Sequence, residues 1–269
     1  MGIFRHLGKA VPPGALLLFI LVNFYFYWLH ASLSLNDLPV FSTFFMVLVA
    51  YFQCIVTNPG KVPNNFDFIE ESSKKRLANC EYTSELKPAF ASFCERCLKG
   101  RPARSHHCSQ CGVCVLKRDH HCMWINNCVG LLNHKHFIHL IGYGAMTTSL
   151  ISCTLYLHLI ENYEKSSNFD FFGFYLNFST CVALTFMTIY HVWLILANRT
   201  MIEFRYKLKS SIFDIDLLTN LTTQFGSNTL GWFFPVTPSL SLLYFPVKLQ
   251  KPDRSSEILS NIILLPSKE

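Results

Sequence analysis

The chain has 269 residues, of which 51% are hydrophobic and only 15% are charged, and its formal net charge is +6. This length allows one large domain or two small ones. A mean hydropathy of +0.28 is unusual for a soluble protein, so membrane insertion is the first question that the sequence raises.

Four segments are apolar enough to cross a membrane as helices, namely residues 11–31, 38–56, 137–160 and 171–197. A hydrocarbon core about 30 Å thick requires about 20 such residues per helix. None of the four contains Lys, Arg or Glu, which argues against buried helices of a soluble core. The first is too long for a cleaved signal peptide. We therefore predict an all-α membrane protein with four transmembrane helices.

The basic residues predict the orientation of these spans. Two of the 23 Lys and Arg residues precede the first span, 12 lie between the second and third, and eight follow the fourth. The loop around Asn36 has none, and the loop around Glu164 has only Lys165. Because positively charged loops stay in the cytosol, we expect both termini and residues 58–136 to be cytosolic. The positive charge then reflects topology rather than nucleic-acid binding.

These features divide the chain into four parts: residues 1–57 with the first two spans, 58–136 as a cytosolic loop, 137–197 with the last two spans, and a cytosolic region at 198–269. Asn58-Pro59-Gly60 is a helix-stop sequence after the second span. A cysteine-rich domain occupies about residues 92–136, which are poor in aliphatic side chains and need another source of stability.

Seven of the 11 cysteines lie within this domain, in the patterns Cys94-x2-Cys97, Cys108-x2-Cys111-x2-Cys114, Cys122 and Cys128. In a reducing compartment such a cluster is typical of metal binding or chemistry rather than disulfides. Paired Cys-x2-Cys units are typical of tetrahedral zinc sites. Two closed sites need eight ligands, which six Cys and two His can supply, so one cysteine is left over.

Cys122 is the best candidate for the surplus thiol. It follows Asp119, His120 and His121 directly, so a nucleophile, a base and an orienting carboxylate lie within four residues. Neighbouring Lys117 and Arg118 would also favour the thiolate. Spacing alone leaves open the alternative that Cys122 is a zinc ligand and Asp119 a solvated charge.

Asp119-His120-His121-Cys122 resembles the signature of the DHHC-type zinc-dependent protein S-acyltransferases, also called palmitoyltransferases. The resemblance extends to the predicted architecture of four spans with the cysteine-rich domain between spans two and three. Further motifs similar to those of the family are Arg101-Pro102-x-Arg104, Trp124, Asn127-Cys128-Val129-Gly130, Asn133, Phe137, Asn58-Pro59-Gly60, Thr200-Met201-Ile202-Glu203 and Asn220 with Phe225-Gly226.

The resemblance implies two structural zinc ions and a particular division of their ligands, which spacing alone could not select. The first zinc would be bound by Cys94, Cys97, His107 and Cys114, and the second by Cys108, Cys111, His121 and Cys128. This division leaves Cys122 free.

The resemblance also implies a reaction. Cys122 would accept a long-chain fatty acyl group, expected to be palmitoyl, from acyl-coenzyme A and pass it to a cysteine of another protein. His120 would be the general base and Asp119 would orient it. The expected partners are acyl-coenzyme A, the bilayer, and cytosolic or membrane-associated proteins with accessible cysteines, but not nucleic acid. The expected location is an endomembrane, the Golgi or the endoplasmic reticulum.

Other residues receive expected roles. Trp124, Arg101 and Arg104 are candidates for contact with acyl-coenzyme A, although a structural ion pair is an equal alternative for Arg104. Thr200, Glu203 and Asn220 are expected to be structural. Two positions depart from the family pattern: Met123 replaces a common proline, and Met201 replaces a threonine whose hydroxyl could bond Asp119.

Polar residues in the third and fourth spans can be interpreted in two ways. They could face a cavity for the acyl chain, or they could pack helices together through small side chains. His158 and His191 are unusual in spans, but hydrogen-bonded packing is the simpler interpretation. The six small polar residues concerned are Thr147, Thr148, Ser149, Ser152, Thr185 and Thr188.

Three other functions compete with acyl transfer. A non-catalytic zinc-stapled membrane adaptor would need the metal sites but not the thiol of Cys122. A transporter is disfavoured because the spans lack Asp, Glu, Lys and Arg. A nucleic-acid zinc finger is disfavoured by the membrane spans and by the absence of finger-type ligand spacing.

Overall fold

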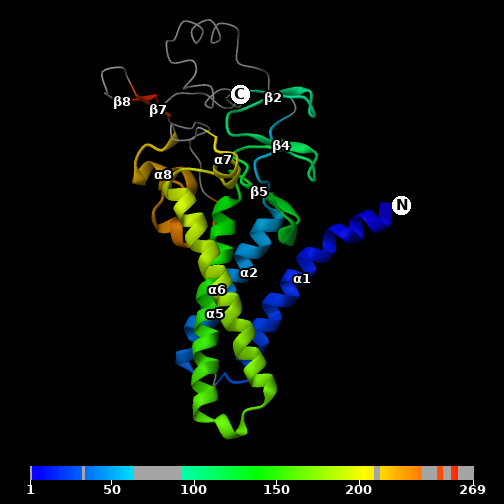
Figure 1. The fold of residues 1–269 in the computed structure, drawn as a ribbon, viewed down its shortest axis with the longest axis vertical. Coiled ribbons are helices and arrows are strands. Elements are labelled where there is room, and N and C mark those ends of the chain that lie inside the picture. The colour runs from blue at the N-terminus through cyan, green and yellow to red at the C-terminus, as the bar shows by residue number, and fades with distance from the viewer. Residues whose placement is uncertain are drawn as a thin grey trace, which may run out of the picture.

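The computed structural model describes residues 2–31, 34–63, 92–208, 213–237, 247–250 and 256–259. Long helices form an elongated bundle, and short β-hairpins and short helices gather at one end of it (Figure 1). The N-terminal end of the first helix lies toward this same end. Residues 64–91 of the predicted cytosolic loop, and much of the chain after residue 237, lie outside the described residues.

Four long helices confirm the four predicted spans, because each is long and apolar enough to cross a membrane. The second has the predicted bounds, the third and fourth begin three residues earlier than predicted, and the first begins at Gly2 and ends at Trp28 rather than spanning 11–31. The chain is therefore a multi-pass membrane protein. The four helices are α1 (Gly2–Trp28), α2 (Leu38–Val56), α5 (His134–Glu161) and α6 (Asn168–Leu196).

Local sequence sets several helix ends. Pro39 lies in the first turn of α2, where a missing N–H leaves no hydrogen bond unmade. Beyond the end of α2, the Asn58 Oδ1 atom accepts hydrogen bonds from the backbone N–H groups of Gly60 and Lys61 at 3.0 and 2.9 Å. Ser167 and Asp170 form a reciprocal capping box at the start of α6.

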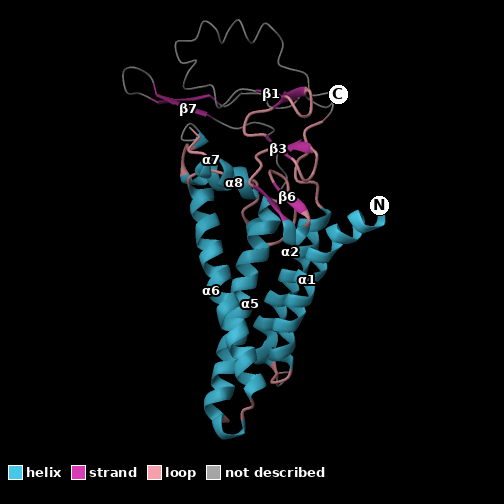
Figure 2. Cartoon of the chain, turned by 45° about the vertical axis from the view of Figure 1, so that its right-hand side comes forward, coloured by secondary structure: helices cyan, strands magenta, loops and turns pink. Residues whose placement is uncertain are grey.

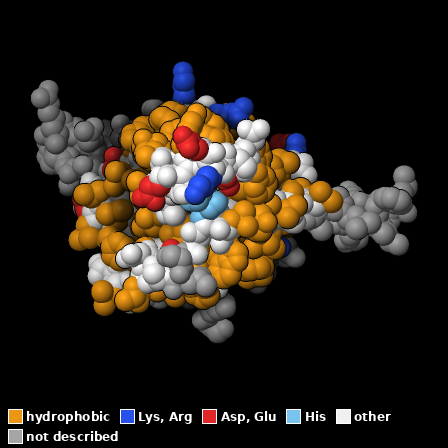
Figure 3. Space-filling model, turned by 90° about the horizontal axis from the view of Figure 1, so that it is seen from below, with side chains coloured by type: hydrophobic (Ala, Val, Ile, Leu, Met, Phe, Trp, Pro, Cys, Tyr) orange, Lys and Arg blue, Asp and Glu red, His pale blue; other side chains and the backbone are white. Residues whose placement is uncertain are grey.

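The outside of the bundle is rich in exposed apolar side chains, such as Phe172, Tyr175 and Phe186 of α6. From the end opposite the hairpins, hydrophobic side chains surround a small polar tip (Figure 3). The short connection between α5 and α6 carries Glu164 and Lys165. An apolar belt with a polar tip is the arrangement that a bilayer requires, since lipid replaces water around the helices.

Within the described residues, two buried clusters hold the bundle together. The cluster nearer the α5–α6 connection consists of Phe26, Tyr27, Val40, Ile151 and Leu155, with further apolar residues packed against it. The other contains Val47, Tyr51, Cys122, Phe137 and Ile141 among its members. Because this second cluster joins residues of the helices to Cys122, the cysteine-rich segment shares its core with the membrane helices. The hairpins lie directly at the end of the helix bundle (Figure 2).

The cysteine-rich segment folds as three two-stranded antiparallel hairpins, which the sequence analysis did not specify. Among the residues that the structure describes, its own buried cluster is small and centres on Cys108, Val115 and Cys128. This supports the expectation that metal ligands stabilise the segment. The hairpins pair β1 (Ser92–Cys94) with β2 (Lys99–Arg101), β3 (His106–Cys108) with β4 (Val113–Val115), and β5 (His120–Cys122) with β6 (Asn127–Val129).

Two asparagines attach the third hairpin to the end of α2. Asn127 Nδ2 donates to the carbonyl oxygens of Cys54 and Thr57 at 3.2 and 3.0 Å. Asn133 Nδ2 donates to the carbonyl of Cys128 in the hairpin at 2.8 Å and to the carbonyl of Cys54 in α2 at 3.5 Å. The bonds to Cys54 and Thr57 satisfy carbonyl groups that the end of α2 leaves without partners, and they fix the hairpin that carries Cys122 at the end of the bundle.

The C-terminal region adds helices α7 (Met201–Arg205) and α8 (Leu217–Phe225) and a 3₁₀ turn at Leu230–Phe233. The turn packs against the start of α5, because Lys135 Nζ donates to the Gly231 carbonyl at 2.7 Å. A last antiparallel hairpin pairs β7 (Val247–Gln250) with β8 (Ser256–Leu259).

Candidate active site and metal centres

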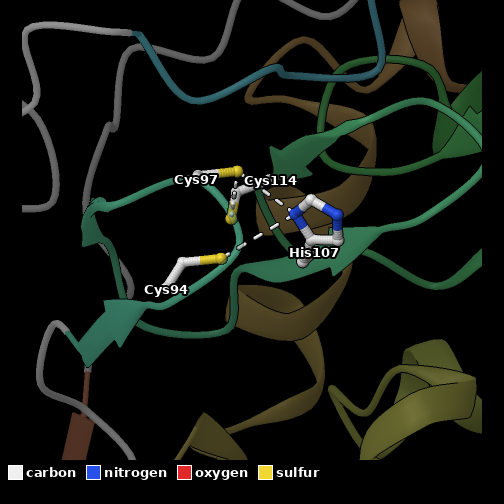
Figure 4. Close-up of side chains that lie close together, drawn as sticks. All are labelled: Cys94, Cys97, His107 and Cys114. Atoms are coloured by element: carbon white, nitrogen blue, oxygen red, sulfur yellow. Dashed lines mark hydrogen bonds between the residues drawn. The ribbon is translucent and has the colours of Figure 1, made fainter.

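The first metal centre joins the first and second hairpins. Cys94 and Cys97 come from β1 and the turn that follows, His107 from β3 and Cys114 from β4. Their side chains converge in Figure 4, with sulfur-to-His107-Nδ1 distances of 3.8 Å for Cys94 and 3.1 Å for Cys97. The sulfurs of Cys114 and Cys97 are 3.8 Å apart.

The second metal centre joins the second and third hairpins. His121 Nδ1 lies 3.6 Å from the sulfur of Cys108, 3.4 Å from that of Cys111 and 3.7 Å from that of Cys128. The sulfurs of Cys111 and Cys128 are 3.6 Å apart. Both groups have the membership that the family resemblance implied.

The donor geometry of both groups fits zinc. Tetrahedral zinc with bonds of about 2.3 Å to sulfur and about 2.0 Å to nitrogen separates its ligand atoms by about 3.5 to 3.8 Å. The measured separations lie within a few tenths of an ångström of this range. Two Cys/His metal-binding clusters are therefore present in the segment.

Cys122 lies outside both clusters. Successive side chains of a β-strand point to opposite faces, so His120 and Cys122 of β5 share one face while His121 occupies the other. The same three-residue strand thus turns one imidazole to a metal cluster and presents the thiol and the second imidazole to the helices. The alternative in which Cys122 is a metal ligand is not supported by this arrangement.

Asp119, which is buried, and the partly buried His120 form an ion pair beside Cys122. The Nδ1 atom of His120 lies 2.8 Å from Asp119 Oδ2, which leaves Nε2 available for proton exchange. Burial alone would lower the pKa of His120, but its hydrogen bond to Asp119 and its interaction with Cys122 raise that pKa to about 9. Burial alone would raise the pKa of Asp119, yet the hydrogen bond from His120 holds it well below its usual range.

Met201 contributes its backbone to the same carboxylate. The Met201 N–H donates to Asp119 Oδ1 at 2.7 Å, so the missing threonine hydroxyl is replaced by a main-chain donor. This N–H belongs to the first turn of α7, where a helix has unpaired donors. Thr200 and Glu203 close the N-terminus of α7 in a capping box, which keeps that donor in place.

Arg104 links the cysteine-rich segment to α7. Its guanidinium donates to both carboxylate oxygens of Glu203 at 2.7 and 2.8 Å, and to the side chain and carbonyl of Asn198 at 2.9 and 2.7 Å. The group also lies 4.4 Å from the centre of the Phe213 ring. These contacts favour the structural ion pair over an acyl-coenzyme A contact for Arg104, whereas the same contact for Arg101 stays a prediction.

Other sequence candidates have clear positions. Trp124 is half exposed and lines the cavity next to Cys122. Met123, the other departure from the family pattern, is exposed at the start of a 3₁₀ turn. Asn220 is buried, and its Nδ2 donates to the Leu196 carbonyl and to Asp214 at 2.7 and 2.8 Å. It therefore attaches α8 to the end of α6, in keeping with a structural role.

An apolar cavity of about 500 Å³ begins at Cys122 and is lined by residues of all four long helices. On α5 the lining positions recur every three or four residues, from Phe137 through Gly144 to Ile151. At 1.5 Å per residue this stripe is about 21 Å long. Of the six small polar residues of the last two spans, only Thr147 and Thr148 line the cavity.

Two buried histidines lie close to Asp119 in addition to His120. His191 of α6 was noted in the sequence for its rarity in a span, but His134 at the start of α5 was missed by the sequence analysis. The sequence signal that could have indicated His134 is the run His134-Lys135-His136 at the start of a membrane-spanning helix. Ionisable residues are costly to bury in such a helix and therefore often have a functional role. Asp119, His134 and His191 form a third group of potential ligands.

Comparison with known proteins now identifies the class. The family model described as DHHC palmitoyltransferase matches residues 87–207. "Probable protein S-acyltransferase 14" of Arabidopsis thaliana is 31% identical over 253 residues, covering 79% of this chain and 76% of that protein. Palmitoyltransferase ZDHHC20-A of Danio rerio is 32% identical over 47% of this chain and 39% of its own length. Palmitoyltransferase ZDHHC15 of Rattus norvegicus is 28% identical over 42% of this chain and 37% of its own length.

The site and these matches define a membrane-embedded acyltransferase. The chain belongs to the DHHC palmitoyltransferase family. Family membership supports an enzyme over the non-catalytic adaptor considered above.

Proposed function

We propose that this chain transfers a long-chain acyl group, palmitoyl in the first instance, from acyl-coenzyme A to cysteines of other proteins through an acyl-Cys122 intermediate. One observation carries the proposal. The only cysteine of the segment 94–128 that belongs to neither metal cluster shares a strand face with His120 and borders an apolar cavity.

In the first half-reaction the Cys122 sulfur attacks the thioester carbonyl carbon of acyl-coenzyme A. A new carbon–sulfur bond forms, the bond to the coenzyme A sulfur breaks, and His120 moves the proton of Cys122 to the departing thiolate. Asp119 orients His120 and stabilises its imidazolium form. The energy of one thioester is exchanged for that of another, so positioning accounts for much of the rate enhancement.

In the second half-reaction a cysteine of a substrate protein attacks the acyl-Cys122 carbonyl. His120 accepts the proton of that thiol and returns one to the Cys122 sulfur as the bond breaks, which restores the enzyme. Any cysteine that reaches the membrane surface near Cys122 is a chemically competent acceptor. We therefore propose cytosolic or membrane-associated proteins with accessible cysteines as partners.

The cavity supports a long, apolar acyl chain as the transferred group. Each methylene moved from water into an apolar site contributes about 0.8 kcal/mol. The apolar stripe on α5 is about 21 Å long, so it offers continuous apolar contact to an acyl chain much longer than an acetyl group. Trp124 at the cavity entrance and Arg101 outside it are the proposed contacts for the coenzyme A part.

We also propose that both Cys/His clusters hold zinc and that zinc has a structural role. The ligands would be Cys94, Cys97, His107 and Cys114 in one site and Cys108, Cys111, His121 and Cys128 in the other. All four positions of each site are then protein atoms, which leaves no place for an activated water. Zinc bound in this way would cross-link the hairpins, and Asn127 and Asn133 would hold them against α2.

The orientation follows from the charge pattern. We propose that the hairpins and both termini face the cytosol in an endomembrane, the Golgi or the endoplasmic reticulum. Epitope tags at the two ends should be accessible in cells whose plasma membrane alone is permeabilised. Access to a tag in the loop at Glu164–Lys165 under the same conditions would contradict the proposed orientation.

The test of the function is an acyl-adduct assay on the purified full chain in detergent with labelled palmitoyl-coenzyme A. Wild type should acquire a label that hydroxylamine removes, and Cys122→Ser should acquire none. Cys153→Ser, which alters an exposed cysteine of α5, is the matched control and should keep the label. A label of wild-type intensity on Cys122→Ser would overturn the proposal.

A further inference from the structure

Three side chains from three separate elements meet beside the proposed catalytic pair. Asp119 precedes β5, His134 begins α5, and His191 lies in the last third of α6. One ligand atom from each lies within 4.8 Å of the other two. Asp119 Oδ2 and His191 Nδ1 are 4.0 Å apart, which is too long for a hydrogen bond.

The imidazoles of this group have unused ring nitrogens. His134 is 1% exposed and neither of its ring nitrogens has a hydrogen-bond partner among the described residues. His191 is 2% exposed and its Nδ1 likewise has none. Buried polar groups are nearly always paired, so unpaired nitrogens around a buried carboxylate point to a missing partner. That partner must accept lone pairs from imidazole and carboxylate together.

A divalent transition-metal ion meets this requirement. Two imidazoles and one carboxylate are a common protein ligand set for zinc and for iron, with the remaining position taken by water. Ligand atoms bound at about 2.0 Å to a tetrahedral ion are about 3.3 Å apart, so these three atoms would approach one another by about 1.5 Å at most. We propose that Asp119, His134 and His191 form a third metal site, for a divalent ion of the zinc type, separate from the two Cys/His clusters.

This site would inhibit the enzyme, a consequence that rests on the proposed function. Asp119 Oδ2 is the atom that lies 2.8 Å from His120 Nδ1. An ion bound to that oxygen withdraws its negative charge from His120, which then loses its orienting partner. Because Asp119 is fully buried, the ion must enter during an opening of the structure, so inhibition should develop slowly.

Cobalt distinguishes the third site from the others because it reports on its ligands. The two-zinc protein, full-length and in detergent, is titrated with Co²⁺, and bound metal is measured by elemental analysis after desalting. Wild type should take up one equivalent beyond the two zincs. Its visible spectrum should lack the sulfur-to-metal charge-transfer bands of a thiolate site, because the third site contains no cysteine.

Two variants test the assignment. His191→Gln and His134→Gln should each lose the extra equivalent while retaining two zincs, which shows that the hairpins remain folded. His158→Gln is the control, because His158 also lies in α5 but contacts His30 rather than Asp119. It should bind the extra equivalent as wild type does.

The functional arm uses Zn²⁺ and the rate of acyl-Cys122 formation. Preincubation of wild type with Zn²⁺ should slow this step by about tenfold or more, in line with the contribution of an oriented base, and His191→Gln should resist the inhibition. The proposal would be overturned if wild type took up no extra equivalent of cobalt, or if the extra equivalent of cobalt survived both histidine substitutions. Uptake of cobalt is measured without turnover, so it tests the site even if the acyl-transfer proposal fails.

Discussion

Asp119 uses its two carboxylate oxygens for two different neighbours. Oδ2 holds His120 Nδ1 at 2.8 Å and Oδ1 accepts the Met201 N–H at 2.7 Å. The backbone donor keeps the carboxylate from rotating, and the carboxylate in turn fixes which ring nitrogen of His120 carries the proton. The replacement of the family threonine by Met201 is therefore compatible with an oriented base.

Asp119→Asn tests the charge of this carboxylate with little change of shape. The amide has no negative charge to stabilise imidazolium and can present an N–H group to His120, which favours the wrong tautomer. We expect acyl-Cys122 formation in a single turnover to slow by about 10²- to 10⁴-fold, with zinc content unchanged. Asp170→Asn, at the opposite end of the bundle, is the control. A wild-type rate for the Asp119→Asn enzyme would remove Asp119 from the mechanism.

Arg104→Met tests the buried ion pair between the hairpins and α7. The substitution leaves the Glu203 carboxylate, which is 4% exposed, without its main partner. Removing one member of a buried pair typically lowers the free energy of unfolding by about 3–5 kcal/mol. Thermal denaturation in detergent should therefore show a lower midpoint, while the KM for palmitoyl-coenzyme A of the remaining folded enzyme stays near that of wild type.

Arg101→Met serves as the comparison for that prediction. If Arg101 binds coenzyme A phosphates, its loss raises KM with little change in the denaturation midpoint. The reverse pattern, with a raised KM for Arg104→Met and unchanged stability, would indicate that Arg104 contacts acyl-coenzyme A.

At the level of elements, β5 explains why one short sequence serves two purposes. Its alternation sends His121 to a metal cluster and His120 and Cys122 to the helices. The count of eight ligands and one surplus cysteine was available from the sequence. The division of ligands was not, because it depends on how separate hairpins interleave, and this is why only the family resemblance supplied it.

The α5 helix sets the depth of the cavity, and Ile151 lines its deepest position on that helix. Ile151→Phe adds volume there and should shorten the acyl chain that fits, so loading should shift from stearoyl- and palmitoyl- toward myristoyl-coenzyme A in a competition assay. Ile151→Val removes one methylene and should shift loading the other way. An unchanged chain-length ratio in both variants would mean that the acyl chain does not reach Ile151.

The α8 helix is joined to the hairpins by Lys117, whose buried Nζ donates to Gln224 Oε1 at 3.2 Å. Burial lowers the pKa of Lys117 from 10.5 to about 7. Between these values the unfolded chain binds more protons than the folded one, so stability rises with pH by about 1.4 kcal/mol per unit. From pH 7 to about pH 8.5 the denaturation midpoint of wild type should rise relative to that of Lys117→Met. If the denaturation midpoints of wild type and Lys117→Met changed in parallel with pH, this assignment of the Lys117 pKa would be contradicted.

For the whole molecule, the membrane spans were the most predictable feature, since length and hydropathy alone define them. The bounds of α2 were found because its apolar run begins at Leu38 and Asn58-Pro59-Gly60 stops the helix beyond its end. The meeting of Asp119, His134 and His191 was not predictable, because it requires the packing of two spans against a hairpin. No local pattern encodes such a contact between distant segments.

The same architecture predicts how the protein responds to loss of metal. The hairpins have a buried cluster centred on two cysteines and one valine, so they depend on metal ligands, whereas the long helices are stabilised by packing and by lipid. A strong chelator should abolish acyl-Cys122 formation but remove only a small part of the far-ultraviolet helical signal, and stoichiometric Zn²⁺ should restore activity. Limited proteolysis should then cut within residues 92–133 before it cuts any span. A metal-free protein that still loads Cys122 at the wild-type rate would show that the clusters do not hold the hairpins together.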